Sequence, residues 1–386
     1  MIKPGYKRLG DYIEPLDERN TNLSVKLSQG ICNNKYFITP RQVAENSAND
    51  KIVRTGQFAY NRATTRNGDK ISIAYREGPD CTVSSAYQIF RIKDENKLNP
   101  HYLWMWFRRP EFDRYARFKS RGSAHEFFEW DEMCEVYLPI PDIHEQRRIV
   151  AEYQAVEKRI ATNEALIAKL EETAQTIYKK MFVDDIDPEN LPNGWSHRSL
   201  KEIVVVKGGK RLPKGEELTD IPNSHPYIKV ADMSKARILE LDDSFQYVED
   251  DIQSSISRYN VSSGDVILSI VGTIGNVNIV GDSLDKANLT ENCVKLVGKK
   301  EFSNLVYAFL TSTEGKKQIE QAIVGGVQSK LPIYNIEKLD LILPDTVSLN
   351  QFNSRISVIN EAITLAIKEN KELRKLSLLM HARLSS

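Results

Sequence analysis

Two stretches of the chain carry apolar residues at alternating spacings of four and three, which is the seven-residue repeat of a coiled-coil helix. The first seam consists of Ile149, Tyr153, Val156, Ile160, Asn163, Ile167, Leu170, Ala174, Ile177 and Met181. The second seam consists of Phe352, Ile356, Ile359, Ile363, Ala366, Asn370, Leu373, Ser377, Met380 and Leu384. We therefore expect long helices over residues 142–183 and 345–386. Capping boxes, Asp142 with Glu145 and Ser348 with Gln351, are predicted at their starts.

Each seam contains one asparagine, fifth from the start in the first seam and fifth from the end in the second. Antiparallel pairing therefore places Asn163 opposite Asn370, whereas parallel pairing puts them out of step. A buried polar pair of this kind lowers stability but fixes the register of the two helices. At ~1.5 Å per residue, about forty residues make a rod of roughly 60 Å. The alternative is that each helix packs elsewhere without the other.

Short runs typical of β-strands precede each helix and are bounded by turn residues. They cover residues 70–75, 86–92 and 136–140 before the first helix, and 202–207, 265–271, 276–280 and 339–343 before the second. Helical patterns interrupt them at residues 100–117 and 305–323. The predicted fold class is α+β: two globular domains with mixed or antiparallel sheets, residues 1–141 and 184–344, separated by two long antiparallel coiled-coil helices.

The two globular domains end in similar sequences. Residues 120–141 match residues 323–344, so that Gly122 falls on Gly325 and Pro141 falls on Pro344. Residues 9–13 and 200–204 share their apolar positions as well. The chain is therefore expected to repeat one unit, a globular block followed by a helix.

Composition narrows the class of protein. Of 386 residues, 41% are hydrophobic and 27% are charged, which is typical of soluble globular proteins. No apolar run approaches the ~20 residues of a membrane span, and no apolar stretch of signal-peptide length follows the N-terminus. The four cysteines are far apart and are expected to be reduced thiols. These features predict a cytoplasmic protein without a membrane partner.

The net charge is zero overall but uneven along the chain. Residues 1–141 contain 22 Lys and Arg against 18 Asp and Glu, a net charge of +4, and residues 184–344 contain 18 against 24, a net charge of −6. A protein that bound nucleic acid by bulk positive charge would carry more cations. If this chain reads DNA, local groups of residues do so, within an assembly whose other subunits neutralise much of the phosphate charge.

Motifs for catalysis are incomplete. Asn99-Pro-His-Tyr102 is partly similar to the loop with which amino-methyltransferases hold a flipped base, but it lacks the second proline, and no glycine-rich cofactor loop precedes it. Residues 144–148 begin like a zinc-protease helix but have Arg148 in place of the second ligand. Residues 207–215 are basic and glycine-rich without the P-loop spacing. We predict no catalytic residue, no metal site and no cofactor bound by this chain.

Polar and basic loops remain as candidates for DNA contact, because Arg, Lys, Asn, Gln, Ser and Thr can read base edges or hold phosphates. In the first domain they contribute Asn61, Arg62, Thr65, Arg66, Lys70, Lys119, Arg121 and His125. In the second domain they contribute Lys207, Lys210, Arg211, Lys214, Thr273, Asn276, Gln328, Ser329 and Lys330. Each loop alone reads more simply as solvated surface. Their presence in both copies, beside Gly122 and Gly325, favours a binding surface.

Three stretches resemble the specificity subunit of type I restriction-modification systems. They are Leu191-Pro-Asn-Gly-Trp195, residues 138–149 leading into the first helix, and residues 325–331 before the second helix. The resemblance covers essentially the whole chain. It departs from the pattern where Asn350-Gln351 stands in place of Glu145-Gln146 and no arginine pair follows.

The resemblance implies two target-recognition domains, residues 1–141 and 184–344, each reading one half of a bipartite sequence in double-stranded DNA. The helices would set the spacer between the halves and dock two adenine-methylating modification subunits. The chain itself would lack catalysis, with S-adenosylmethionine and ATP/Mg bound by partner subunits; whether restriction subunits (translocase and endonuclease) join is left open. The alternatives are a self-sufficient DNA methyltransferase or nuclease, and a coiled-coil scaffold with no nucleic-acid role.

Overall fold

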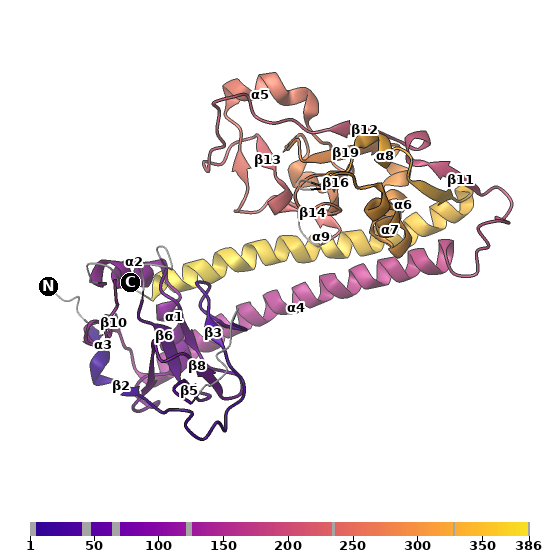
Figure 1. Cartoon of the computed structure of the whole chain (residues 1–386). Helices are drawn as coiled ribbons and strands as arrows, with labels where there is room; N and C mark the ends of the chain where they lie inside the picture. Colours follow the sequence, from indigo (N-terminus) through magenta and orange to yellow (C-terminus); the bar gives the residue numbers. More distant parts are fainter. Residues whose placement is uncertain are drawn as a thin grey trace. The chain divides into compact units, whose positions relative to one another are not determined.

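The computed structural model describes residues 5–40, 48–63, 70–120, 126–233, 236–326 and 329–384. The chain forms two compact units: unit 1 is Met1–Lys158 with Leu373–Ser386, and unit 2 is Arg159–Glu372. Both units include part of each long helix, α4 (Ile143–Phe182) and α9 (Thr346–Arg383) (Figure 1). The compact units therefore divide the chain within the helices, whereas the sequence divides it at the helix ends.

Unit 1 is built on an antiparallel sheet in the order β2-β9-β6-β7. Stacked and edge-on aromatic rings, Phe58, Phe90 and Phe107, fill the core between this sheet and helix α1. The elements are β1 (Tyr6–Arg8), β2 (Ile13–Leu16), β3 (Gly30–Ile31), β4 (Phe37–Ile38), β5 (Lys51–Val53), β6 (Phe58–Asn61), β7 (Ile73–Tyr75), β8 (Cys81–Val83), β9 (Tyr87–Ile92), β10 (Tyr137–Pro139), α1 (Pro100–Phe107), α2 (Pro110–Lys119) and α3 (Trp130–Cys134).

Unit 2 has a five-stranded sheet in the order β12-β19-β16-β17-β14 and a three-stranded sheet in the order β15-β13-β18. Strand β14 runs parallel to β17 and β13 runs parallel to β18, so both sheets are mixed. The elements are β11 (Ser196–Ser199), β12 (Val204–Gly208), β13 (Pro226–Ile228), β14 (Ile238–Leu239), β15 (Gln246–Tyr247), β16 (Val266–Ser269), β17 (Val277–Val280), β18 (Asn288–Leu289), β19 (Cys293–Gly298), β20 (Asp340–Leu343), α5 (Asp250–Ile256), α6 (Lys300–Thr311), α7 (Thr313–Ala322) and α8 (Ile333–Ile336). The predicted α+β class is confirmed.

The two units repeat one topology. In each, an outer strand is followed directly by a 3-10 turn and pairs with a strand that comes just before the long helix: β1, η1 (Leu9–Asp11) and β10 in unit 1, and β11, η2 (Leu200–Glu202) and β20 in unit 2. The sheet order β2-β9-β6-β7 in unit 1 corresponds to β12-β19-β16-β17 in unit 2. Three helices and the long helix follow in the same sequence order. The repeat expected from the sequence is therefore present in the fold.

The runs predicted as strands all contain strands, but each predicted helical segment before the long helices is two helices. Residues 100–117 divide into α1 and α2 because Pro110 lacks a backbone N–H and cannot continue a helix. Residues 305–323 divide into α6 and α7 at Ser312, whose hydroxyl accepts a hydrogen bond from the Gly315 amide and caps α7.

The long helices pair antiparallel within each unit. In unit 2, Asn163 Nδ2 lies 2.9 Å from Asn370 Oδ1, and the Arg159 guanidinium donates twice to the Glu369 carboxylate at 2.9 Å. In unit 1 the Tyr153 and His381 rings meet edge-on, with centroids 4.9 Å apart. Every seam position is buried or half-buried. The alternative of two unrelated helices is thereby excluded.

The predicted helix caps are only partly formed. Asp142 accepts hydrogen bonds from the amides of His144 and Glu145, but the Glu145 side chain binds Arg148 instead of closing a capping box. The second prediction is wrong, because α9 begins at Thr346, before Ser348. Asp345 is the capping residue there: it accepts a hydrogen bond from the Ser348 amide at 2.7 Å and a second from the Trp195 indole at 3.2 Å.

Candidate nucleic-acid interface

In unit 2 the candidate residues gather at one edge of the five-stranded sheet. Gly208 at the end of β12 pairs with Val294, and Ser269 at the end of β16 pairs with Cys293. The ends of β12 and β16 and the start of β19 therefore meet at the same edge. An isolated bridge between Val271 and Lys330 adds the segment after α7 to this edge. Three segments that are distant in sequence are thus brought together: residues 207–214, 270–276 and 329–330.

The turn between β16 and β17 is held by its own hydrogen bonds. The Ser269 hydroxyl donates to the Thr273 carbonyl at 2.6 Å and accepts from the Asn276 amide at 2.9 Å. Gly272 and Gly275 have φ values of +79° and +95°, which favour glycine. The turn therefore exposes Thr273 on a fixed backbone.

The basic segment after β12 lies against the backbone of a neighbouring loop. The Lys210 amide donates to the Leu289 carbonyl at 2.7 Å, and a Cβ on Gly209 would lie 2.1 Å from the Thr290 carbonyl oxygen. Only glycine permits this approach. Arg211 is paired with Glu291 at 2.6 Å but remains exposed. Lys207, Lys210 and Lys214 are exposed too, so this segment offers its cations to solvent at the sheet edge.

Unit 1 has the same arrangement around Asn61 and Arg62. Asn61 ends β6, and the Arg62 carbonyl accepts a hydrogen bond from the Phe128 amide at 2.8 Å. An isolated bridge joins Ala63 to Phe127. Phe127 follows Gly122 by five residues, as Lys330 follows Gly325 by five. Phe127, which follows α2, and Lys330, which follows α7, therefore bridge to equivalent hairpins, β6–β7 in unit 1 and β16–β17 in unit 2.

A family model for the type I restriction modification DNA specificity domain matches this chain twice, over residues 22–172 and 192–375. The chain belongs to this family. It therefore has the DNA-recognition role of a type I specificity subunit.

Two similar proteins are type I restriction enzyme specificity subunits. The type I restriction enzyme MjaVIII specificity subunit of Methanocaldococcus jannaschii is 21% identical over 300 residues, 74% of this chain and 69% of the relative. The MjaIX specificity subunit of the same organism is 24% identical over 293 residues, 71% of this chain and 66% of the relative. The crystal structure of a type I restriction-modification S subunit from M. genitalium shares the fold, with a TM-score of 0.57 at 13% identity, covering 99% of this chain and 96% of that one.

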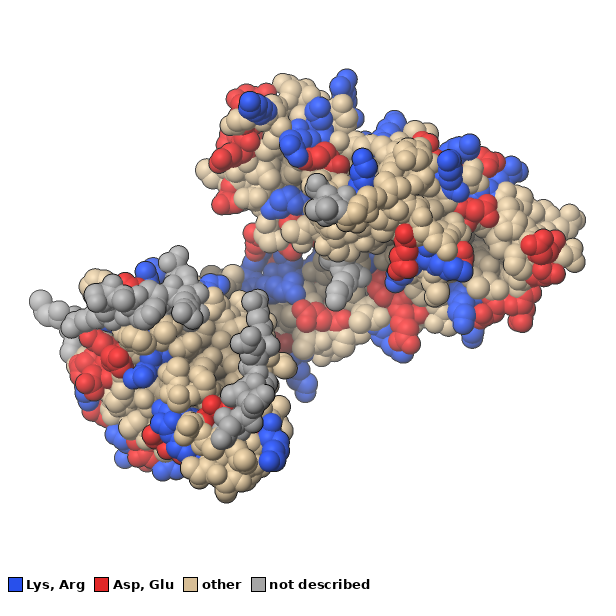
Figure 2. All heavy atoms as spheres, viewed as in Figure 1, with Lys and Arg blue, Asp and Glu red and all other residues tan. Residues whose placement is uncertain are grey.

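In unit 1, two of the described cations of the interface, Arg62 and Lys119, are paired with carboxylates. Arg62 Nη1 lies 3.4 Å from Glu129, and Lys119 Nζ lies 3.0 Å from Glu132. The Arg62–Glu129 pair is exposed, and exposed ion pairs contribute little to stability, so it leaves Arg62 able to contact a phosphate. Lys70 is exposed. Figure 2 shows cationic and anionic side chains interspersed on both units.

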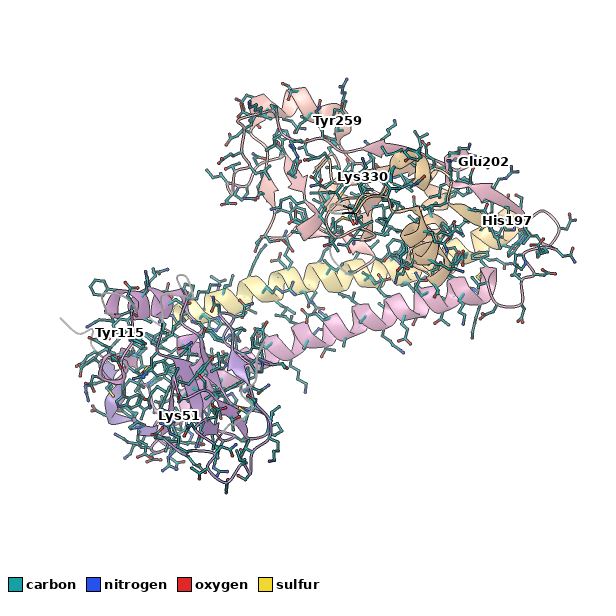
Figure 3. All side chains as sticks on the ribbon, in the orientation of Figure 1. Lys51, Tyr115, His197, Glu202, Tyr259 and Lys330 are labelled. Atoms are coloured by element: carbon teal, nitrogen blue, oxygen red, sulfur yellow. The ribbon has the colours of Figure 1, made fainter. Side chains whose placement is uncertain are left out.

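Five candidate residues lie outside the described part of the chain: Thr65, Arg66, Arg121, His125 and Gln328. Ser329 is described and exposed beside Lys330. These two follow the repeated glycine and stand at the bridge to the β16–β17 turn. Lys330 is labelled in Figure 3.

Sequence reasoning missed a cation and aromatic cluster next to Lys210. The Tyr259 ring, labelled in Figure 3, lies 5.6 Å from Lys210 Nζ and 4.9 Å from Arg258 Cζ. Cations over an aromatic face are held by its quadrupole, and all three groups are able to contact a DNA backbone or base. The adjacent Arg258 and Tyr259 were the available signal, but they lie about fifty residues from Lys210 in sequence.

The partial catalytic motifs have structural roles. Asn99 caps α1, accepting hydrogen bonds from the amides of His101 and Tyr102. Arg148 binds Glu145 and Glu152 along the surface of α4. In the described ranges, no three His, Cys, Asp or Glu side chains lie close enough together to hold a metal ion. No helix in the same ranges is long and apolar enough to cross a membrane.

Proposed function

We propose that this specificity subunit reads a bipartite DNA target, with one half-site read by each unit. The observation that carries this proposal is the repeated bridge, Ala63 with Phe127 and Val271 with Lys330. It brings the described residues beside the candidate loops, Asn61 and Arg62 in unit 1 and Ser329 and Lys330 in unit 2, to equivalent sheet edges. Two copies of one surface are suited to two half-sites.

The long helices set the spacer between the half-sites in this proposal. Their antiparallel pairing and buried asparagines support a fixed register. A spacer set in this way changes only when the helices change in length. Base contacts at the sheet edges and spacer length are therefore separate properties of the chain.

The chemistry belongs to partner subunits in this proposal, with S-adenosylmethionine and ATP/Mg bound there and not by this chain. Two modification subunits dock against the helices. Exposed apolar side chains on α9 support such docking: Val358 and Leu365 are 66% and 69% exposed in unit 2, and Leu379 is 62% exposed in unit 1. Val358, Leu365 and Leu379 are separated by multiples of seven residues and so share one helix face, and apolar side chains gathered on one exposed face are typical of interaction sites.

The experiment is methylome sequencing of cells that express the chain with its methyltransferase partner. We expect adenine methylation at one bipartite motif with a fixed spacer, dependent on both proteins. Matched cultures lacking either protein are the controls. Methylation by the chain alone would favour the self-sufficient enzyme, and a motif independent of the chain would contradict the proposal. A methyl-donor binding assay on the purified chain distinguishes a self-sufficient methyltransferase, which binds the donor, from a subunit that depends on its partner for methylation.

A further inference from the structure

The turn between β3 and β4 in unit 1 is unusual because its one buried residue is a lysine. Lys35 is 5% exposed and has a φ of +66°, whereas its neighbours Asn34 and Tyr36 are exposed. The turn is closed by two backbone hydrogen bonds, from Lys35 to Cys32 at 2.9 Å and from Cys32 to Tyr36 at 3.1 Å. The turn therefore exposes Asn34 and Tyr36 on either side of the buried Lys35.

The Lys35 ammonium group is held by α1 and α2. Its Nζ lies 2.8 Å from Asp113 Oδ1 and donates to the Phe107 carbonyl. Burial lowers the pKa of Lys35, and the charge of Asp113 opposes that shift. Burying an ammonium group is costly unless it is paired, and an apolar side chain would fill the same space more cheaply. The pair therefore contributes more than packing: it fixes the position of the turn.

The Asp113 carboxylate also connects the turn to the residues that lead from the candidate DNA loop into β7. Asp113 Oδ1 also accepts a hydrogen bond from the Ile71 amide at 3.2 Å, and Asn33 Oδ1 accepts one from the Ser72 hydroxyl at 3.0 Å. Ile71 and Ser72 lie just before β7, at the return of that loop. The turn is thus anchored to Ile71 and Ser72, directly before β7.

The turn also lies at the sheet edge where Asn61 and Arg62 lie. The Ile31 amide at the end of β3 donates to the Tyr87 hydroxyl at 3.2 Å. Tyr87 begins β9 and pairs directly with Asn61 at the end of β6. A duplex that contacts this edge can therefore reach both Asn61 and the turn.

We propose that the β3–β4 turn is a second reader of the half-site recognised by unit 1, with Asn34 and Tyr36 contacting base edges and Lys35 and Asp113 positioning them. Asparagine pairs with adenine through its amide, and the tyrosine ring can contact the thymine methyl group while its hydroxyl finds a polar partner. This inference rests on the proposed function of the chain.

The test uses the full chain with either Asn34→Ala or Tyr36→Ala, expressed with its methyltransferase partner. Two readouts are the methylated motif and the binding of the complex to duplexes altered one base pair at a time. We expect discrimination to fall by about 5- to 150-fold at one or two base pairs of a single half-site. The other half-site and the spacer stay unchanged and serve as the internal reference.

A matched control is Asn96→Ala, an exposed asparagine in the turn after β9, at the opposite end of that strand from Tyr87. It should leave the motif unchanged. Lys35→Met removes the positioning charge at similar volume; it should relax the same half-site as Asn34→Ala while the other half-site is still read, which a general folding defect would not do.

Two outcomes would overturn the inference. One is unaltered discrimination at every base pair in Asn34→Ala and Tyr36→Ala. The other is a uniform loss of affinity across sequences, which indicates phosphate contact. In both cases a bipartite motif in the unaltered complex leaves the proposed function intact, whereas absence of any such motif in the unaltered complex would contradict the proposed function itself.

Discussion

Asn163 donates its side-chain amide to the side-chain oxygen of Asn370, and the two residues are only 2% and 3% exposed within the helix pair of unit 2. Replacing Asn163 alone with Leu leaves the Asn370 oxygen without this donor, so the free energy of unfolding should fall by about 1–3 kcal/mol. Replacing both with Leu should recover that loss and exceed the unaltered stability, because an apolar pair suits a seam. Urea denaturation followed by circular dichroism measures both. A double variant less stable than the unaltered chain would show that the pair is a net stabiliser.

His381 should make unit 1 sensitive to acid. Burial, with the nearby charge of Arg108, lowers the pKa of His381 to about 4. Because the folded state disfavours the charged imidazole, its contribution is present above the unfolded pKa of 6.5 and is lost as pH falls from 6.5 to about 4. The shift corresponds to about 3 kcal/mol. His381→Phe keeps the ring contact with Tyr153 and should remove this part of the pH dependence.

Melting temperatures of the unaltered chain and His381→Phe, measured from pH 7 to pH 4, test this. Carboxylates titrate in both proteins near the lower limit, so the difference between the two curves isolates the histidine. Parallel curves over that range would contradict the prediction.

Each half-site should respond to its own unit. Arg62→Ala is expected to relax or weaken recognition of one half-site, and Lys330→Ala that of the other. A lost bidentate base contact costs about 1–3 kcal/mol at one position, whereas a lost phosphate contact weakens all sequences alike. Glu129→Gln, which frees Arg62 from its ion pair, is the matched control and should preserve the motif. Changes in both half-sites from Arg62→Ala alone would contradict two independent readers.

Spacer length should follow helix length. We expect one heptad inserted in α4 between Glu157 and Glu172, with a second inserted opposite it in α9, to keep the seam in register. The added length is about 10 Å, or about three base pairs. Methylome sequencing should then show the same half-sites with a longer spacer. A heptad inserted in α4 alone breaks the pairing and is the control. An unchanged spacer in the paired variant would exclude the helices as the ruler.

The helices and the repeat could be predicted from the sequence because their signals are periodic. A seam with one asparagine in each helix has a single antiparallel alignment, and Gly122 and Gly325 mark equivalent positions of the repeated sequence. The breaks at Pro110 and Ser312 were missed because apolar periodicity continues across them.

The site could be predicted only as a set of separate loops. Nothing local in the sequence links Val271 to Lys330, or Lys210 to Tyr259, because these contacts depend on strand order and helix packing. Buried ion pairs are harder still: Lys35 and Asp113 each look like ordinary surface residues in sequence. Their burial is determined by tertiary structure alone.

The division of the two units along the chain has a consequence for synthesis. Unit 2 is one continuous segment of the chain, so it can complete its fold once Glu372 has been synthesised. Unit 1 is not: its core includes Leu384, more than two hundred residues after Lys158. Domains generally fold as units during translation, the N-terminal one first. Here the order of completion is reversed, so the part made first stays unfinished longest and is the part most exposed to truncated translation.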